Sequence, residues 1–255
     1  MDKSIIFDQV ADIYDYYVTT DLDINFFLEE FKGKTGPVLE LMCGTGRVSI
    51  PLIANGIQLT CVDYSSGMLK KLRDKLNHQG LGADLLEGDV RELELNKLYD
   101  YIFIPFNSFM ELTDKASQLQ ALNRIHRHLN PNGIFICTLH NPMQRINQAS
   151  GEKIFRGEFP LPDNRSLQLY AVEHYNTELK IVYGKQFFYW YDSQGNLEAE
   201  RQLDIKFSLI GKAEFENMAS SSGFTVLNLY GDYDRNQFDS TRSPFMIYYL
   251  GKAVQ

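Results

Sequence analysis

The sequence predicts an α/β fold, with a mostly parallel seven-stranded sheet, helices on both of its faces and an inserted antiparallel β-meander. From residue 37 to about residue 140, short apolar runs alternate with stretches whose apolar residues recur every three or four positions. From residue 165 to residue 209 this rhythm stops, and apolar and polar residues alternate one by one. At 255 residues, the chain is long enough for one domain with an embellishment.

The strands of the main sheet are expected in seven short apolar runs. Five precede the meander and two follow it, at 38–42, 57–62, 83–87, 99–105, 134–139, 224–230 and 246–250. After the second run, Ser65 can cap a helix that Gly80 ends. The helix before the fifth strand is expected to stop at the sequence Asn-Pro-Asn-Gly (130–133), and a last helix is expected from about Lys212 to Ser222.

The composition disfavours several classes of function. The 33 acidic and 25 basic residues give a net charge of about −8, which repels phosphate backbones, so we expect no nucleic-acid partner. Cys43, Cys61 and Cys137 lack metal-ligand spacing, so we expect no metal site. The N-terminus lacks the apolar core of a signal peptide, and no stretch approaches the ~20 apolar residues that span a bilayer. We therefore expect a cytoplasmic protein without a membrane partner.

The clearest ligand signal is the sequence ELMCGTGR at 40–47, where an apolar run leads into a glycine turn before a helix. Such a turn exposes backbone N–H groups, and the start of the helix adds a partial positive charge that favours a carboxylate or a phosphate. Glycines also form ordinary turns between strands and helices, so the turn alone leaves ligand binding open.

An acidic residue at the end of the second expected strand narrows the choice of ligand. Asp63 stands 17 residues after Gly46, where a carboxylate can accept hydrogen bonds from both hydroxyls of a ribose. The alternative interpretation is a surface acid near the helix N-terminus at Ser65. The turn and the acid fit a nicotinamide dinucleotide or S-adenosylmethionine. Ser49 stands where the dinucleotide fingerprint has its third glycine, so S-adenosylmethionine fits better.

Five stretches resemble the class I S-adenosylmethionine-dependent methyltransferases, specifically the small-molecule methyltransferase-domain group. They follow the family's order and spacing over roughly residues 36–140. These stretches are ELMCGTGRVSIPL (40–52), CVDYSSGML (61–69), LEGDVREL (86–93), YDYIFIPFNSF (99–109) and LNRIHRHLNPNGIFI (122–136). Met42 departs from the family, which usually has glycine or alanine there, so its side chain must point away from the methionine moiety or pack against it.

The resemblance implies a Rossmann-like methyltransferase fold and a domain organisation. We expect a single methyltransferase domain over 1–255, beginning with an N-terminal helical cap over 1–35. A cofactor-binding core follows over 36–140. The antiparallel β insertion over 150–210 is expected to form part of the substrate site, and 211–255 to supply the last helix and two strands.

The resemblance also implies contacts with S-adenosylmethionine. On the methionine side, Glu40 is expected to orient the turn, Gly44, Thr45 and Gly46 to approach the ligand, and Asp63 to hold the ribose.

Further along, Tyr64 and Met68 are expected to pack on the adenine, Asp89 to accept from its amine, and the Val90 backbone to contact a ring nitrogen. Phe106 and Asn107 would face the sulfonium and the acceptor. The alternatives are a solvated loop acid for Asp89 and a core position for Phe106.

Two further segments resemble the family. The segment 7–15 resembles a helix that folds over the cofactor, in which Tyr14 is the best match for a tyrosine that contacts the cofactor carboxylate. Tyr17 follows one turn later, and an amphipathic helix with exposed tyrosines is the alternative. The segment 230–239 resembles a loop at the acceptor site, in which Tyr233 and Arg235 are candidate substrate contacts; a packed hairpin turn explains it equally well.

His140 follows the fifth strand, where an imidazole can deprotonate an acceptor, although a loop histidine without a role is the alternative. The aromatic run at 187–191 fits a wall or a cage for a cationic amine, or ordinary sheet packing.

Together these features predict transfer of a methyl group from S-adenosylmethionine to an N or O atom of a small molecule, by an in-line displacement. Tyr14 and His140 are the candidate catalytic residues. The alternatives are a non-catalytic protein that binds S-adenosylmethionine or S-adenosylhomocysteine, and a protein methyltransferase. We expect a monomer or a homodimer.

Overall fold

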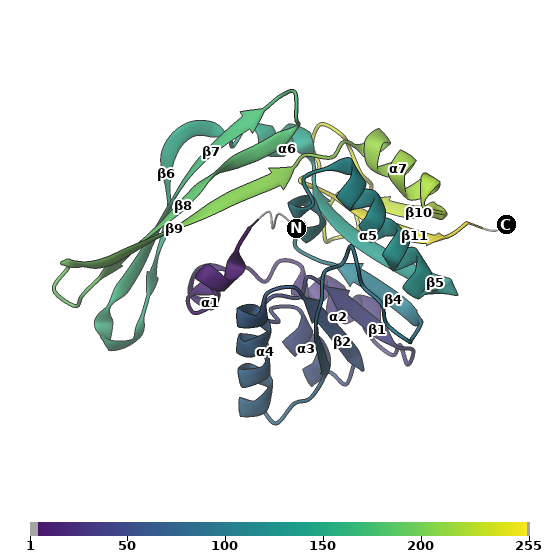
Figure 1. Ribbon diagram of the computed structural model, residues 1–255, viewed down its shortest axis with the longest axis horizontal. Helices are drawn as coiled ribbons and strands as arrows, with labels where there is room; N and C mark the ends of the chain where they lie inside the picture. Colours follow the sequence, from purple (N-terminus) through teal and green to yellow (C-terminus); the bar gives the residue numbers. More distant parts are fainter. Residues whose placement is uncertain (1–4, 254–255) are drawn as a thin grey trace.

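The computed structural model describes residues 5–253, so the predicted ends of the domain at 1–4 and 254–255 lie outside the described residues. Its main sheet has seven strands in the order β10-β11-β5-β4-β1-β2-β3 (Figure 1). All strands run parallel except β11, which is antiparallel to both neighbours. The strands are β1 (Val38–Leu41), β2 (Leu59–Asp63), β3 (Asp84–Glu87), β4 (Tyr99–Ile104), β5 (Leu129–His140), β10 (Phe224–Tyr230) and β11 (Phe245–Lys252).

Helices cover both faces of this sheet, because successive strand residues point to opposite sides and both sides are apolar. On one face, strand residues such as Leu39 and Ile102 pack against α5 (Lys115–His128) and α7 (Lys212–Ser221). On the other face, residues such as Val38 and Phe103 pack against α2 (Ile24–Phe31), α3 (Ser49–Ala54) and α4 (Ser66–His78). The mostly parallel sheet with two covered faces is confirmed.

A second sheet of four antiparallel strands, sheet B, stands beside the first (Figure 1). The chain enters it after α6 (Pro142–Ile146) and leaves it into α7. Alternate residues of β7 (Ser166–Asn176) are buried, as the alternation predicted, and they form the apolar face of sheet B together with Phe188, Leu203 and Ile205. Its strands are β6 (Ser150–Pro160), β7 (Ser166–Asn176), β8 (Ile181–Tyr191) and β9 (Leu197–Ser208), and η3 (Pro162–Asn164) joins the first two.

The N-terminal segment, residues 5–18, packs on the apolar face of sheet B. Its buried Val10 and Ile13 form a cluster with Leu167 and Phe188. The continuous helix expected over 7–15 is wrong: the segment forms a 3-10 turn, η1 (Phe7–Gln9), and a single helical turn, α1 (Tyr14–Tyr17). Contacts with sheet B and α4 override the weak helical preference of this β-branched and aromatic stretch.

The fifth strand starts earlier than the sequence predicts. Residues 130–133 were expected as a turn, yet β5 begins at Leu129, which pairs with Tyr99. The pairing shifts register between Tyr99 and Tyr101, so the Asn-Pro-Asn-Gly residues are accommodated as an irregularity inside the strand.

Candidate active site

Functional groups gather at one edge of the main sheet, where the carboxyl ends of the parallel strands meet. Met42 follows β1, Asp63 ends β2 and Asp89 follows β3. Phe106 follows β4, and His140 ends β5. Three cavities lie along this edge, here named the Asp63 pocket, the Glu40 pocket and the His140 cavity.

The Asp63 pocket lies beyond β2 and β3 and is lined by Met42, Tyr64, Asp89 and Val90, among others. Asp63 itself is buried, and its carboxylate accepts hydrogen bonds from the backbone N–H of Gly44 at 2.7 Å and of Ser65 at 2.8 Å. Burial raises the pKa of Asp63 to about 6, although these N–H groups oppose the shift.

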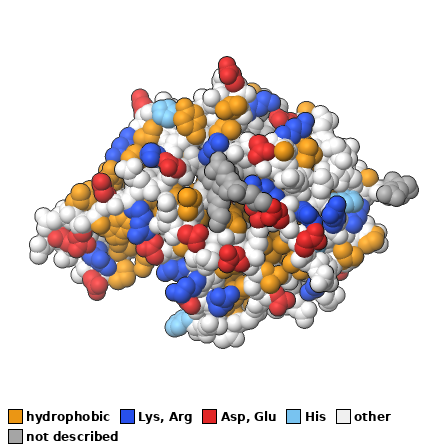
Figure 2. Space-filling model, viewed as in Figure 1, with side chains coloured by type: hydrophobic (Ala, Val, Ile, Leu, Met, Phe, Trp, Pro, Cys, Tyr) orange, Lys and Arg blue, Asp and Glu red, His pale blue; other side chains and the backbone are white. Residues whose placement is uncertain are grey.

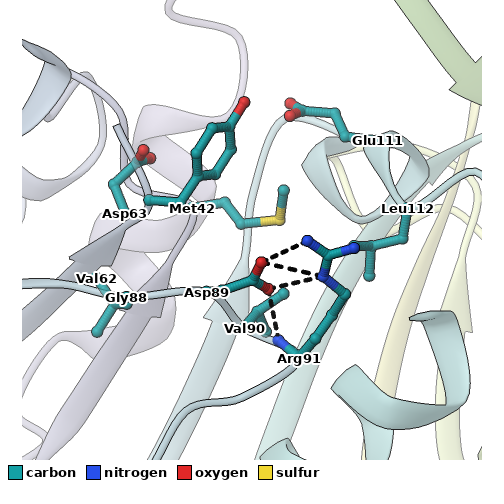
Figure 3. A pocket seen from close by; sticks show the side chains of 10 residues that line it. Met42, Val62, Asp63, Gly88, Asp89, Val90, Arg91, Glu111 and Leu112 are labelled. Atoms are coloured by element: carbon teal, nitrogen blue, oxygen red, sulfur yellow. Dashed lines mark hydrogen bonds and ion pairs between the residues drawn. The ribbon is translucent and has the colours of Figure 1, made fainter. Parts of the chain in front are cut away.

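The far side of this pocket is formed by two further acidic residues. Asp89 accepts hydrogen bonds from Arg91 on both carboxylate oxygens (Figure 3). The Glu111 carboxyl lies across the pocket from Asp63, at the end of the 3-10 helix η2 (Ser108–Glu111). Burial, together with the charge of Asp63, raises the pKa of Glu111 well above its usual value. The Met42 side chain reaches into the space between these groups.

The two glycines of the turn, Gly44 and Gly46, have different surroundings. Gly44 has a φ of 57°, lines the Glu40 pocket and has open space where a Cβ would lie. A Cβ on Gly46, whose φ is 86°, would lie 2.2 Å from Cδ1 of Leu72 on α4. Gly44 therefore leaves room for a ligand, whereas Gly46 permits close packing of the turn on a helix.

The Glu40 pocket lies against the glycine turn. Glu40 is fully buried and accepts a hydrogen bond from the Ser49 hydroxyl at 2.5 Å. Burial raises the pKa of Glu40 to about 8. Arg47 and Tyr14 line the same pocket. The guanidinium of Arg47 pairs with buried Asp23, with one contact of 2.8 Å.

Residues 5–18 close the glycine turn from the outside. The Thr45 hydroxyl donates to Asp15 at 2.5 Å, and Lys75 of α4 pairs with the same carboxylate at 2.8 Å. Asp8 accepts from the backbone N–H of Gly67 at the start of α4, at 2.8 Å. These contacts hold Tyr14 where the Glu40 pocket meets the His140 cavity.

The His140 cavity, of about 440 Å³, lies between the edge of the main sheet, the N-terminal segment and sheet B. Phe106 and Asn107 enter it from a turn with two consecutive left-handed residues, with φ values of 56° and 62°. The backbone N–H of Asn107 donates to Thr138 Oγ1 at 3.1 Å, which helps to hold this unusual conformation. Tyr17 and Tyr233 also line the cavity.

His140 is a neutral imidazole at physiological pH. Burial, with a smaller contribution from the charge of Arg145, lowers its pKa to about 4. Its Nε2 lies 3.3 Å from the Asn107 side-chain nitrogen, and its ring stacks on Phe245. The Asn107 side-chain oxygen is buried without a hydrogen-bond partner.

The part of the cavity nearest sheet B carries a charge cluster. Glu173 of β7 is buried and binds Arg145 of α6 at 2.7 Å and Arg156 of β6 at 3.0 Å. All three residues line the cavity. Nη1 of Arg145 is buried without a hydrogen-bond partner.

Known proteins share this architecture. The sequence profile of the methyltransferase domain matches residues 38–133. A putative methyltransferase, YqeM of Bacillus subtilis, is 24% identical over 212 residues, which are 81% of this chain and 81% of YqeM. The chain is an S-adenosylmethionine-dependent methyltransferase, and its residues 38–133 are similar to the class I methyltransferase domain.

Solved structures show the fold of this methyltransferase over its whole length. The CcbJ methyltransferase of Streptomyces caelestis superposes with a TM-score of 0.81 at 24% identity, covering 100% of both chains. CalS10, an amino pentose methyltransferase of Micromonospora echinaspora solved with S-adenosylmethionine bound, has a TM-score of 0.67 at 15% identity, covering 96% of this chain and 91% of its own.

The structure brings most of the predicted site residues of the methyltransferase to the three cavities. The exceptions are Met68, Gly46 and Arg235. Met68 is buried in the first turn of α4, where its backbone N–H donates to Ser65, and it lines none of the three cavities. Arg235 lines none of the three cavities, and its side chain pairs with Glu30 of α2 at 3.3 Å.

Besides Arg91, which pairs with the predicted Asp89, five charged residues that line the cavities were missed by the sequence analysis. Two of them carried a signal in the sequence. Arg47 directly follows the glycine turn, and Glu173 interrupts the apolar positions of an alternating strand. The remaining three join the site only through tertiary packing; they are Glu111, Arg145 and Arg156.

Among residues 5–253, no helix is long and apolar enough to cross a membrane.

Proposed function

We propose that this methyltransferase methylates an amine nitrogen of a small molecule bound in the His140 cavity. The observation that carries the proposal is the junction of the cavities: Tyr14, Phe106 and Ser108 line both the Glu40 pocket and the His140 cavity. An acceptor in the cavity therefore lies beside the bound cofactor. The name of CalS10 as an amino pentose methyltransferase agrees with a small amine acceptor.

We assign the Asp63 pocket to the adenosine of S-adenosylmethionine and the Glu40 pocket to its methionine. Asp63 would accept hydrogen bonds from the ribose, and Asp89 would share its carboxylate between Arg91 and the adenine amine. Gly44 lets the backbone approach the ligand, and Arg47 and Tyr14 would face its carboxylate. The residues present therefore fit the cofactor.

When bound, S-adenosylmethionine supplies a methyl group already activated by the sulfonium, so the protein mainly has to align the acceptor and exclude water. Phe106 is held under the Arg47 guanidinium, 4.4 Å from the ring centre, at the junction of the pockets. The Asn107 oxygen would accept a hydrogen bond from the acceptor amine and orient its lone pair. The segment 5–18 would shield the reacting atoms from water.

The protonation states favour nitrogen over oxygen as the acceptor atom. A hydroxyl must lose a proton to become a good nucleophile, and an efficient base has a pKa near the working pH. His140, with a pKa of about 4, is a weak base, and burial raises the pKa of Tyr14 above its usual value. A neutral amine already carries the lone pair that attacks the methyl group. The proposed role of His140 is therefore to position the acceptor.

Acidic and basic side chains are interspersed on the face seen in Figure 2, which agrees with a small-molecule acceptor better than with a nucleic acid.

Two measurements test this function. Calorimetric titration of S-adenosylhomocysteine should give micromolar binding that weakens about tenfold or more in Asp63→Ala, the scale of one lost charge-assisted hydrogen bond. Methyl transfer should then be screened by mass spectrometry against matched small amines and alcohols. We expect turnover of amines. Turnover of alcohols alone would refute N-methylation, and cofactor binding without any turnover would favour a non-catalytic binding protein.

A further inference from the structure

The charge cluster in the His140 cavity indicates what else the acceptor carries. We propose that the acceptor has an anionic oxygen group, a carboxylate or a phosphate, that binds to Arg145 and Arg156 at the sheet B side of the cavity. This inference rests on the proposed function, because it describes the molecule that the cavity would present to the cofactor.

The first observation is an incomplete set of hydrogen bonds at Arg145. This residue is only 9% exposed, and one terminal nitrogen binds Glu173 at 2.7 Å. The other terminal nitrogen is buried and has no partner. A buried donor without a partner is unfavourable, and a bound ligand is one of the partners that can complete its hydrogen bonds. Arg145 lines the cavity, so a bound molecule can reach it.

The second observation is a surplus of positive charge. Two guanidinium groups, those of Arg145 and Arg156, share the single carboxylate of Glu173. The other acidic residue of the cavity, Glu111, has a pKa raised well above its usual value, which favours its neutral form. His140 is neutral as well. The charge cluster therefore has one more guanidinium than carboxylate at the sheet B side of the cavity, and an anionic oxygen group would balance it.

The third observation indicates where the amine of the acceptor would bind. The buried oxygen of Asn107 also lacks a partner, and it lies on the turn that follows β4, beside the Glu40 pocket. This oxygen requires an N–H or O–H donor, whereas Arg145 requires an acceptor. The cavity thus fits a molecule with the methyl-accepting amine at Asn107 and the anionic oxygen group at Arg145.

A purely structural ion-pair cluster is the competing explanation, and two variants of Arg145 separate it from a binding site. Arg145→Gln removes the charge but leaves Glu173 paired with Arg156. Arg145→Lys keeps the charge but loses the planar fork that binds Glu173 and an anion together. The exposed Lys185, which pairs with Asp204 on sheet B, supplies a matched control in Lys185→Gln.

Anion binding is measured first, on the full chain saturated with S-adenosylhomocysteine. Acetate and inorganic phosphate are titrated separately by NMR, following the side-chain signals of Arg156, which every variant retains, with folding checked by circular dichroism. We expect saturable binding of one or both anions, weakened at least tenfold in Arg145→Gln, weakened less in Arg145→Lys, and retained within about threefold in Lys185→Gln. Glu173→Gln, which removes the competing carboxylate, should bind the anion more tightly. Absence of saturable binding, or equal loss in folded Arg145→Gln and Glu173→Gln, would overturn the proposal.

The acceptor is tested next with small amines in matched sets: the neutral amine, its carboxylate derivative and its phosphate derivative. We expect kcat/KM to favour one of the two anionic derivatives over the neutral amine by at least tenfold, and Arg145→Gln to abolish that preference. If neutral amines react as well as their anionic partners, this inference fails while N-methylation stands. If anions bind at Arg145 but no amine is methylated, the proposed function fails instead.

Discussion

Glu40 and Asp63 are carboxyl groups buried at the ends of neighbouring strands, and burial acts on both in the same direction. Water no longer solvates the charged form, so the pKa rises to about 8 for Glu40 and about 6 for Asp63. Such shifts occur where a site binds charged or polar ligands, because the fold holds these groups in place for the ligand. They also make stability depend on pH.

Glu40→Gln should change how stability depends on pH. A pKa raised from 4.5 to about 8 means that the folded state prefers the protonated form of Glu40. The contribution of Glu40 to the free energy of unfolding is fully present below pH 4.5. It is lost as pH rises towards 8, by up to ~1.4 kcal/mol per pH unit. The free energy of unfolding of the cofactor-free protein should therefore fall between pH 5 and pH 8 relative to Glu40→Gln, as measured by urea denaturation. The exposed Glu87→Gln is the control, and parallel curves for wild type and Glu40→Gln would contradict the argument.

The two glycines of the turn should respond differently to alanine. Gly46→Ala would place a methyl group 2.2 Å from Leu72 and should destabilise the fold by about 1–3 kcal/mol. Gly44→Ala meets no atom within 4 Å, so its cost in stability is smaller and comes from the left-handed backbone. Its methyl group should instead weaken binding of S-adenosylhomocysteine by about tenfold or more. Denaturation and calorimetry on both variants check this difference; similar effects in both assays would rule out the separate roles.

At the scale of elements, the N-terminal segment completes the site without being a regular helix. Three aspartates hold its short turns in place. Asp8 contacts α4, and Asp15 contacts Thr45 of the glycine turn. Asp12 pairs with Arg201 of sheet B at 2.6 Å. The polar contacts fix the segment to α4 and the glycine turn, so their loss can loosen that side of the segment while its apolar residues stay packed on sheet B. We therefore expect release of the cofactor to depend on these contacts.

Asp15→Ala should accelerate release of S-adenosylhomocysteine. The substitution removes the Thr45 hydrogen bond, worth roughly 1 kcal/mol, and frees the segment over the glycine turn. We expect the dissociation rate, followed by stopped-flow fluorescence, to rise about threefold to tenfold. Lys75→Ala removes the partly exposed ion pair with Asp15 but keeps the Thr45 contact, so it should have little effect. Equal rates in wild type and Asp15→Ala would show that the segment does not control release.

At the scale of the whole molecule, sheet B is joined to the main sheet around the His140 cavity. The cluster of Val10, Ile13, Leu167 and Phe188 connects sheet B to the N-terminal segment, which in turn covers the glycine turn. The N-terminal segment, sheet B and the wall of the His140 cavity therefore form one packed unit. A defect in this cluster should affect both stability and binding.

Phe188→Ala tests this coupling. Phe188 is fully buried and its ring centre lies 5.0 Å from that of Tyr17, so its removal should destabilise the protein by about 3–5 kcal/mol. The affinity for S-adenosylhomocysteine should also fall, because Tyr14 and Tyr17 lose their support. Phe155→Ala, on an exposed part of sheet B, should change stability by less than about 1 kcal/mol. Unfolding of Phe188→Ala and calorimetry at a temperature where it stays folded would check both effects; unchanged affinity would disprove the coupling.

The sequence by itself determined the alternating core, the approximate positions of the main-sheet strands, the glycine turn and the acid at Asp63. These features arise from local periodicity and from motifs of a few residues, which one continuous stretch of chain contains. The resemblance to the family added Tyr14 and Asn107, and the end of the fifth strand indicated His140; the structure places all three along the cavities.

Only the tertiary structure decided the broken N-terminal segment, the contact of Arg235 with α2, and the cluster of Arg145, Arg156 and Glu173. Arg145 and Glu173 are 28 residues apart, and their contact exists because α6 and sheet B fold against the same cavity. Charge and burial at such a site depend on what packs around it, and sequence spacing does not encode that packing. The periodic pattern therefore specifies the scaffold, whereas the arrangement of charges that would select an acceptor emerges only when distant segments meet.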